Sequence, residues 1–283
     1  MKITFFYLSF VAIVAELSHA RPLRRRDLDS TSQGNATTSP SNSLVRRAAN
    51  TTQYWTCKEP GSFAVTFDDG PQPNEAAFVN LLNQATVTGT FFVNGYNWDC
   101  IYDEDIVQTL RATYAAGHQI GIHTWGHTHS ADLTQEQFSN QLILLEDALV
   151  KILGVLPAFY RPPYGEISDS NIAVLASRNY SAAIQWDDVS GPATGTSVQA
   201  SNAMYAGKAA TYPSPHLILD HEQDDVAITQ IIPQALAELQ RAGYKLVSVS
   251  ECLDIPPYQW IGQPQARDSS WTCDGKPLPG AAE

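Results

Sequence analysis

Apolar runs and amphipathic stretches alternate along residues 57–252, at intervals that suit strand–helix units. Seven apolar or alternating runs predict strands, at residues 62–69, 88–95, 119–124, 157–161, 180–186, 216–221 and 245–250. Between them lie six stretches of helical periodicity, at residues 74–84, 104–116, 134–153, 168–178, 198–211 and 226–242. This alternation predicts an α/β fold with parallel strands.

The helix predicted at 134–153 has the clearest signals. Thr134 and Gln137 have the spacing of a capping box, in which each side chain hydrogen bonds to the other residue's backbone N–H. The apolar positions that follow recur on one helical face, at Phe138, Leu142, Leu145 and Leu149. This segment is therefore expected to pack one side against the sheet.

Parallel strand–helix units over roughly 200 residues fit either an open doubly wound sheet or a closed barrel. No Gly-rich phosphate-binding loop follows the first predicted strand, which removes the main reason to prefer the open sheet. We therefore expect a barrel. In a barrel the functional residues lie at the C-terminal ends of the strands.

The N-terminal residues predict targeting and processing. Lys2 precedes an apolar run, and Ser18-His19-Ala20 has the form of a cleavage site, so residues 1–20 are predicted to be a secretory signal peptide. Residues 21–47 are polar and Arg-rich, which indicates a disordered propeptide or, alternatively, an uncleaved linker. Residues 48–283 then form one domain with a core at about 57–252 and a C-terminal extension.

Removal of residues 1–47 would change the charge balance of the chain. The remainder would carry 10 basic and 26 acidic residues, a formal net charge of −16. Such a surface repels nucleic acid and anionic lipid, which argues against both as partners. An uncharged polymer, or one that becomes cationic as it is modified, fits better. The last residues contain no apolar tail, so neither a membrane span nor a lipid anchor is expected.

An even number of cysteines is consistent with two disulfides in an oxidising compartment. They are Cys57, Cys100, Cys252 and Cys273. No two lie close in sequence, which argues against a cysteine metal site. Of three possible pairings we favour Cys57 with Cys252, which would tie the ends of the repeating region together, and Cys100 with Cys273.

Secretion would also expose the chain to glycosylation, and we expect an extracellular or cell-wall location. Asn50 and Asn179 each begin an Asn-X-Ser/Thr sequence, and both are candidate glycosylation sites if they lie on the surface. The sequence therefore predicts a secreted protein with disulfides and attached sugars.

Acidic and imidazole side chains stand where predicted strands end. Asp68 and Asp69 close the first strand before a Gly-Pro turn, so that one acid could bind a cation while the other stays free as a base. His123 and His127 have the spacing of a metal-binding pair. With one Asp they would form a three-ligand site open to water. His129 is expected at the surface or behind these ligands.

Two further strand ends carry candidate chemistry. Arg161 precedes two prolines that would stiffen the chain and hold its guanidinium in place, where it could orient a carboxylate. His221 ends an apolar strand, which favours a partly buried imidazole that could act as a general acid.

Five segments in chain order carry these residues. They are Thr66-Phe67-Asp68-Asp69-Gly70-Pro71, His123-Thr124-Trp125-Gly126-His127, Arg161-Pro162-Pro163-Tyr164, Trp186-Asp187-Asp188 and Leu217-Ile218-Leu219-Asp220-His221. Their set and order resemble the NodB-type polysaccharide deacetylases, carbohydrate esterase family 4, and residues 57–252 are most similar to the fungal chitin deacetylases. The resemblance implies a distorted (β/α) barrel with seven or eight strands.

The resemblance also implies a role for each residue. Zinc, or alternatively another divalent ion such as cobalt, would be held by Asp69, His123 and His127. Asp68 would be the general base, and Arg161 would position it. The remaining roles concern the substrate. The Tyr164 N–H would stabilise the oxyanion, His221 would protonate the departing nitrogen, and Trp186 and Leu219 would line the acetyl pocket. Aromatic residues near these strand ends could stack on sugar rings, or several could instead be core or rim residues; they are Tyr96, Trp98, Trp125 and Tyr164.

The fourth segment departs from the family pattern. Relatives carry an Asp where this chain has Val189, and a second Asp where it has Pro192. In the family that acid hydrogen bonds to the catalytic His and keeps it protonated. Asp187 or Asp188 could substitute through a local shift. Otherwise we expect a slowed or pH-shifted enzyme.

The expected function is removal of N-acetyl groups from chitin or chitooligosaccharides by a secreted, metal-dependent chitin deacetylase. Acetylxylan esterase activity with the same residues is one alternative, because the motifs do not separate the two substrates. A chitin-binding relative with weakened turnover is another, motivated by Val189 and Pro192.

Overall fold

The computed structural model describes residues 51–282. The predicted signal peptide, the predicted propeptide and Asn50 lie outside the described residues. Within residues 51–282, no helix is long and apolar enough to cross a membrane.

Every strand and helix predicted from the sequence is present, most of them with shorter bounds; β9 has the predicted bounds and β2 is one residue longer. The strands of the main sheet are β1 (Thr52–Tyr54), β2 (Ser62–Gly70), β3 (Thr90–Val93), β4 (Gln119–Ile122), β6 (Phe159–Tyr160), β7 (Ala182–Ile184), β8 (Asp188–Val189), β9 (His216–His221) and β10 (Lys245–Val247). The α-helices are α1 (Glu75–Gln84), α2 (Glu104–Ala115), α3 (Gln135–Leu153), α4 (Asp169–Ser177), α5 (Val198–Ala209), α6 (Ile232–Ala242) and α7 (Val249–Leu253).

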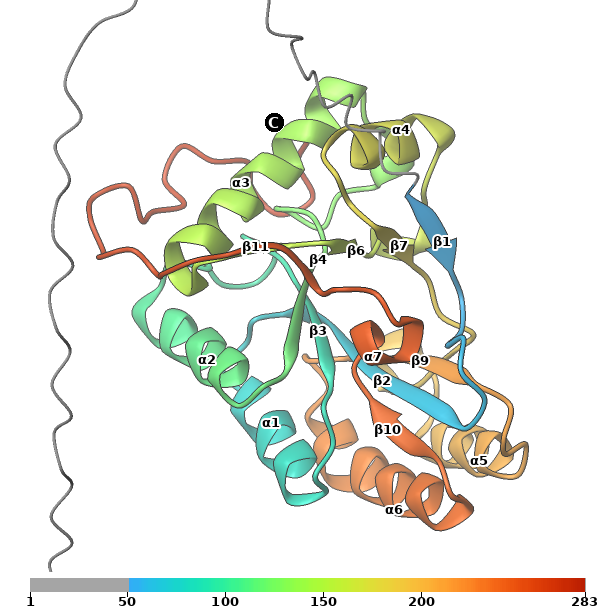
Figure 1. The fold of residues 1–283 in the computed structure, drawn as a ribbon. Helices are drawn as coiled ribbons and strands as arrows, with labels where there is room; N and C mark the ends of the chain where they lie inside the picture. Colours follow the sequence, from blue (N-terminus) through green and yellow to red (C-terminus); the bar gives the residue numbers. More distant parts are fainter. Residues whose placement is uncertain (1–50, 283) are drawn as a thin grey trace, which may run out of the picture. The chain divides into compact units, whose positions relative to one another are not determined.

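All pairings within the main sheet are parallel, and its path runs β1-β7-β6-β4-β3-β2-β9-β8, with β10 paired to β2 beside this path. β7 and β8 stand near opposite ends of this path, yet only residues 185–187 separate them in the chain. Because β7 pairs with β6 and β8 pairs with β9, the chain joins the two sides of the sheet. The predicted distorted barrel is therefore confirmed (Figure 1).

Side chains on β2 show how the barrel is filled. Phe63, Val65 and Phe67 belong to the large apolar cluster between the sheet and its helices. Ala64 belongs to a second cluster with Leu217 and α7 residues. Alternate strand residues point to opposite faces, so the second cluster fills the barrel interior at the end that α7 covers (Figure 1). The polar residues of β2 then lie toward the other end.

Helix α3 begins as its sequence predicts. Thr134 and Gln137 form the reciprocal capping box, and the helix ends at Gly154 in the left-handed conformation that glycine favours. The predicted helix at 226–242 is divided instead. A π-helical turn covers Ala227–Ile231, and α6 begins at Ile232 with Pro233 in its first turn, where a missing N–H costs nothing.

Several short elements were not predicted. They are β1, β8, α7 and an antiparallel ribbon of β5 (Val155–Pro157) with β11 (Tyr258–Ile261). The ribbon lies outside the parallel sheet and joins β5 of the core to β11 of the C-terminal extension. Two- to four-residue strands carry too few positions for a periodicity to be visible in the sequence.

Both predicted disulfides are present, Cys57–Cys252 and Cys100–Cys273, closing separations of 195 and 173 residues. Cys57 and Cys252 are 3% and 0% exposed and belong to the cluster inside the barrel. Cys100 and Cys273 lie at the edge of the larger cluster. The first disulfide therefore holds the barrel, and the second fastens the C-terminal extension.

We expect Cys57→Ala/Cys252→Ala to lower the free energy of unfolding by about 2–5 kcal/mol, measured by urea denaturation. Cys100→Ala/Cys273→Ala is the matched control, because the two loops are of similar length and differ mainly in burial. A smaller loss is expected for the control. Equal losses would show that the interior position of the first disulfide does not matter.

Candidate active site

The two carboxylates at the end of β2 share one neighbour and differ in the other. His123 Nε2 lies 3.7 Å from Asp68 Oδ2 and 3.5 Å from Asp69 Oδ1, whereas Arg161 pairs with Asp68 and His127 with Asp69. Asp68 keeps the strand alternation and faces the barrel interior. Asp69 has φ = 71°, a left-handed conformation that interrupts the alternation and lets its carboxylate reach the loop after β4. Gly70 follows, and a Cβ there would overlap the buried Glu222 carboxylate. Only glycine therefore fits at this close approach.

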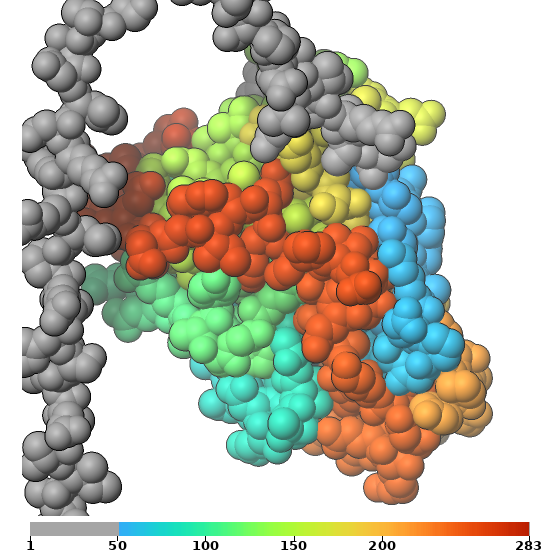
Figure 2. Space-filling view, in the orientation of Figure 1, coloured from blue at the N-terminus to red at the C-terminus, as the bar shows by residue number. Residues whose placement is uncertain are grey.

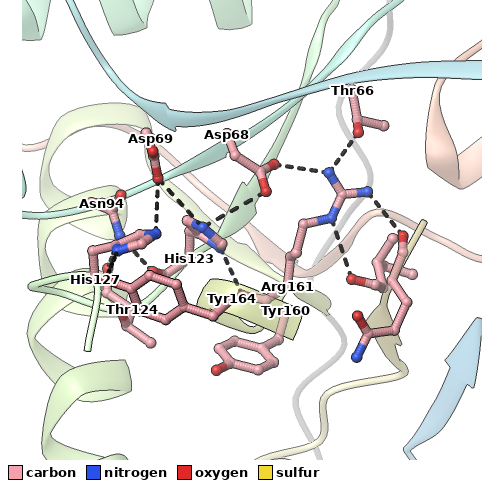
Figure 3. A network of polar contacts seen from close by, with 12 residues as sticks. Thr66, Asp68, Asp69, Asn94, His123, Thr124, His127, Tyr160, Arg161 and Tyr164 are labelled. Carbon is pink, nitrogen blue, oxygen red and sulfur yellow. Dashed lines mark hydrogen bonds and ion pairs between the residues drawn. The ribbon is translucent and has the colours of Figure 1, made fainter. Parts of the chain in front are cut away.

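The loop after β4 carries both predicted histidines to Asp69. The distances from Asp69 Oδ1 are 3.5 Å to His123 Nε2 and 3.1 Å to His127 Nε2 (Figure 3). His123 Nδ1 lies 2.8 Å from the carbonyl oxygen of Arg161, which can only accept, so this nitrogen carries the proton. Burial lowers the pKa of His123 to about 3, so the lone pair on Nε2 stays available.

These three residues suit a metal ion. Their ligand atoms all lie within 4.8 Å of one another. Asp69 Oδ1 is buried and accepts no hydrogen bond of normal geometry from the described residues, although the unprotonated Nε2 of His123 lies 3.5 Å away. A bare carboxylate facing an imidazole lone pair is unfavourable unless a cation lies between them. Gln223, which the sequence analysis missed, donates to Asp69 Oδ2 at 3.0 Å and fixes the carboxylate.

Arg161 and Asp68 form a buried ion pair inside the barrel. The Arg161 side chain is fully buried, and its Nη1 lies 2.8 Å from Asp68 Oδ1 and 2.5 Å from Thr66 Oγ1. Its other donors reach the carbonyl oxygens of Ile184 and Gln185, both at 3.2 Å (Figure 3). Burial raises the pKa of Asp68 to about 6, although the Arg161 charge opposes the rise. Asp68 is thus a carboxylate of increased basicity in a fixed orientation.

Backbone strain gathers around this site. Seven non-glycine residues in the described chain have positive φ, and four of them surround the site: Asp69, Thr124, His127 and Tyr164. Each costs free energy of order 1–3 kcal/mol, which other interactions must offset. Asn94 provides two of these stabilising interactions, because its side chain donates hydrogen bonds to the carbonyl oxygens of His123 and Thr124. Sequence analysis missed Asn94, whose only signal was its position at a strand end.

His221 ends β9 beside Asp68, its register partner on β2. Its Nδ1 is buried without a hydrogen-bond partner, and no carboxylate oxygen of the described residues lies within 4.0 Å of its ring nitrogens. Val189 pairs with Leu219, two residues before His221, so it occupies the same face of the sheet.

The hypothesis that Asp187 or Asp188 substitutes for the family's acid is wrong in this structure. Asp187 Oδ2 lies 2.5 Å from His216 Nδ1 and 3.2 Å from Lys208 Nζ. Asp188 lies 3.4 Å from the same Lys208 nitrogen. Asp187 is therefore bound to His216 at the start of β9 and to Lys208 on α5, and Asp188 is bound to the same Lys208.

Trp125 does not bind a sugar in this structure. It is 0% exposed, packs against Gly95 and donates to the carbonyl oxygen of Pro277, so the prediction of a substrate contact was wrong. Tyr164 does reach the surface, at 55% exposure, with its hydroxyl 3.2 Å from His127 Nδ1. Its ring stacks on His129, which binds Glu166 outside the ligand set.

Trp186 is half-buried and Leu219 is 3% exposed. Leu219 is the register partner of Thr66, so it lies on the face that carries Asp68 and His221. The acetyl pocket assigned to Trp186 and Leu219 stays a prediction, as does the role of the Tyr164 N–H.

Comparison with known proteins agrees with this geometry. The polysaccharide deacetylase family profile matches residues 56–183. A chitin deacetylase from Pestalotiopsis sp is 33% identical over 236 residues, which cover 80% of this chain and 75% of that protein. Both findings fit parallel strands that carry an Asp-His-His group at their carboxyl ends. The chain belongs to the polysaccharide deacetylase family.

Solved structures agree with this assignment. The chitin deacetylase of the fungal pathogen Colletotrichum lindemuthianum superposes with a TM-score of 0.69 at 27% identity, covering 75% of this chain and 95% of that one. A family 4 carbohydrate esterase from Streptomyces lividans, solved in complex with acetate, has a TM-score of 0.56 at 26% identity, with coverages of 66% and 91%. Fungal chitin deacetylases are therefore prominent among its relatives.

Zinc should stabilise this protein through the three ligands. At about 100 times its dissociation constant we expect zinc to raise the melting temperature of the metal-free protein by roughly 5–10 °C. His127→Ala should abolish most of this rise. His129→Ala should keep it, because His129 pairs with Glu166. Scanning calorimetry measures the melting temperatures of the wild type and both variants with and without zinc. An unchanged rise in His127→Ala would contradict the ligand assignment.

Proposed function

We propose that this protein is a secreted, metal-dependent deacetylase that hydrolyses the N-acetyl groups of chitin or chitooligosaccharides, leaving free amines and acetate. Residues 48–283 would form its catalytic domain. The observation that carries the proposal is that the neighbouring carboxylates of Asp68 and Asp69 have different charged or imidazole partners. One carboxylate faces two imidazoles, and the other is held by Arg161 inside the barrel.

A divalent ion such as zinc, held by Asp69, His123 and His127, would polarise the acetyl carbonyl and acidify a hydrolytic water. Asp68 then acts as the general base. With a pKa near 6 it is ionised at neutral pH and still basic enough to take a proton. Arg161 fixes the direction of its carboxylate, so the base is oriented before substrate binds.

His221 supplies the proton that the departing sugar nitrogen needs, because an amine anion is a poor leaving group. His221 is the register partner of Asp68, so the proposed acid and the proposed base lie at the ends of neighbouring strands. The Tyr164 N–H would stabilise the oxyanion, and Trp186 with Leu219 would enclose the acetyl methyl group. The exposed Tyr164 ring offers a surface for the sugar.

Chitin is favoured over acetylated xylan by the likeness to fungal chitin deacetylases. The formal charge of −16 on residues 48–283 is compatible with a neutral polymer that becomes cationic as its amines are released.

The direct test is acetate release from chitin, chitooligosaccharides and acetylated xylan. We expect release from the chitin substrates that is lost on complete chelation and restored by zinc. Greater release from xylan would favour an acetylxylan esterase, and chitin binding without release from any substrate would favour a binding protein. Activity that survives complete metal removal would contradict the proposal.

Because no carboxylate of the described residues lies beside His221, adding one should increase activity at alkaline pH. Val189→Asp would place a carboxylate on the face that carries His221, so the imidazole should hold its proton at higher pH. The alkaline limb of the kcat/KM profile should then move up by about one pH unit, with a gain of up to about 10-fold on that limb.

Val189→Asn is the matched control, because it has nearly the same shape without the charge. Its profile should stay at the wild-type position. Identical profiles for Val189→Asp and Val189→Asn would show that residue 189 does not tune His221.

A further inference from the structure

A groove of about 580 Å³ lies at the opposite end of the barrel from the active site. Its lining includes Ala158 and Ser181, which precede β6 and β7, whereas Arg161 follows β6. The β5–β11 ribbon supplies another wall through Leu156, Tyr258 and Trp260. Figure 2 shows the orange-red surface of the C-terminal residues, which include β11, crossing the near face beside a yellow surface.

Trp260 is held in place with much of its ring exposed. Its exposure is 48%, which is high for an indole in a folded domain. A Cβ at Gly262 would overlap the indole ring, so the ring lies against the backbone there. Next to it, the Gln259 side chain donates to the carbonyl oxygen of Pro157 at 2.9 Å, which fastens the ribbon. The groove is thus a preformed surface with an aromatic wall.

Asn179 lies in the lining of the same groove. It is exposed, follows α4 with φ = 61°, and its side chain has no hydrogen-bond partner among residues 51–282. Ser181 completes the sequence Asn179-Tyr180-Ser181, the acceptor sequence for N-linked glycosylation. Tyr180 is buried and Ser181 N–H bonds to the Ala158 carbonyl oxygen, so the backbone under Asn179 is fixed.

We propose that Asn179 carries an N-linked oligosaccharide whose first sugar packs against Trp260 in this groove. In the covalent step, Asn179 Nδ2 loses a proton and bonds to the anomeric carbon of a lipid-linked oligosaccharide diphosphate, and the lipid diphosphate leaves. The host glycosylation machinery performs this transfer during secretion. The attachment point and the surface that receives the sugar are then parts of one groove.

The groove suits a sugar better than a purely apolar ligand. A pyranose ring has an apolar C–H face and polar edges, and the groove offers the Trp260 and Tyr258 rings beside the Gln259 and Ser181 side chains. Covalent attachment at Asn179 also removes most of the entropic cost of bringing the sugar to Trp260. The contact should therefore form even if a free monosaccharide binds poorly.

This inference depends on passage through a secretory pathway and not on deacetylase chemistry. Its first test is the occupancy of the peptide containing Asn179, measured by mass spectrometry on protein secreted from a eukaryotic host. We expect this peptide to carry a glycan. A peptide that is unmodified in all molecules would overturn the proposal, whatever the activity of the enzyme.

The second test asks whether the glycan packs on Trp260. Ser181→Ala removes the acceptor sequence and keeps Asn179, and we expect it to lower the melting temperature by about 2–4 °C, the shift typical for a contact of this size in a domain of about 230 residues. Trimming the glycan to its first sugar should keep the wild-type temperature.

The control asks whether the effect of Ser181→Ala on the melting temperature depends on the Trp260 ring. In a Trp260→Ala background, Ser181→Ala should lower the melting temperature no further. In a Trp55→Ala background it should lower it as in the wild type, because Trp55 is 52% exposed and lies outside the groove. The same drop in the Trp260→Ala and Trp55→Ala backgrounds would overturn the packing.

Discussion

The buried guanidinium of Arg161 is the constraint on which the site depends, because a charge inside a barrel must be paired and hydrogen bonded where it lies. Its partners are Asp68 and Thr66 on β2 and two carbonyl oxygens at the end of β7. Asp68 is thereby fixed facing inward. The next carboxylate, Asp69, can serve the histidines only by leaving the strand alternation, which its positive φ accomplishes.

This arrangement explains how one strand end serves two chemical roles. The interior cluster and the Cys57–Cys252 disulfide close one end of the barrel, so the polar residues concentrate at the other. There Asp68 and Asp69 are adjacent in sequence but differ in their surroundings, since Asp68 pairs with Arg161 and Asp69 with His127. The weak point is His221, whose Nδ1 has no partner among the described residues. The Asp68 carboxylate is thus fixed by a neighbouring side chain, whereas the Nδ1 of His221 is not.

Much of this could be predicted from the sequence because strand and helix periodicities are local and because the five segments keep their order. Other features depend on distant neighbours. Trp125 stands between two ligands in sequence, yet Gly95 and Pro277 bury it. Asp187 is close to His221 in the predicted pattern, but in the fold it pairs with His216 and Lys208 instead. Gln223 lies in a loop with no pattern, so only the fold shows that it fixes Asp69.

The central claim, that Asp68 and Asp69 have separate roles, is tested most directly by measuring zinc affinity and acetate release in Asp68→Asn and Asp69→Asn. The account predicts that Asp68→Asn keeps zinc affinity near that of the wild type and loses about 10²–10⁴-fold in acetate release from chitooligosaccharides. Asp69→Asn should bind zinc much more weakly than the wild type, and its acetate release should fall for that reason. Wild-type turnover in Asp68→Asn, or equal losses of zinc affinity in both variants, would contradict it.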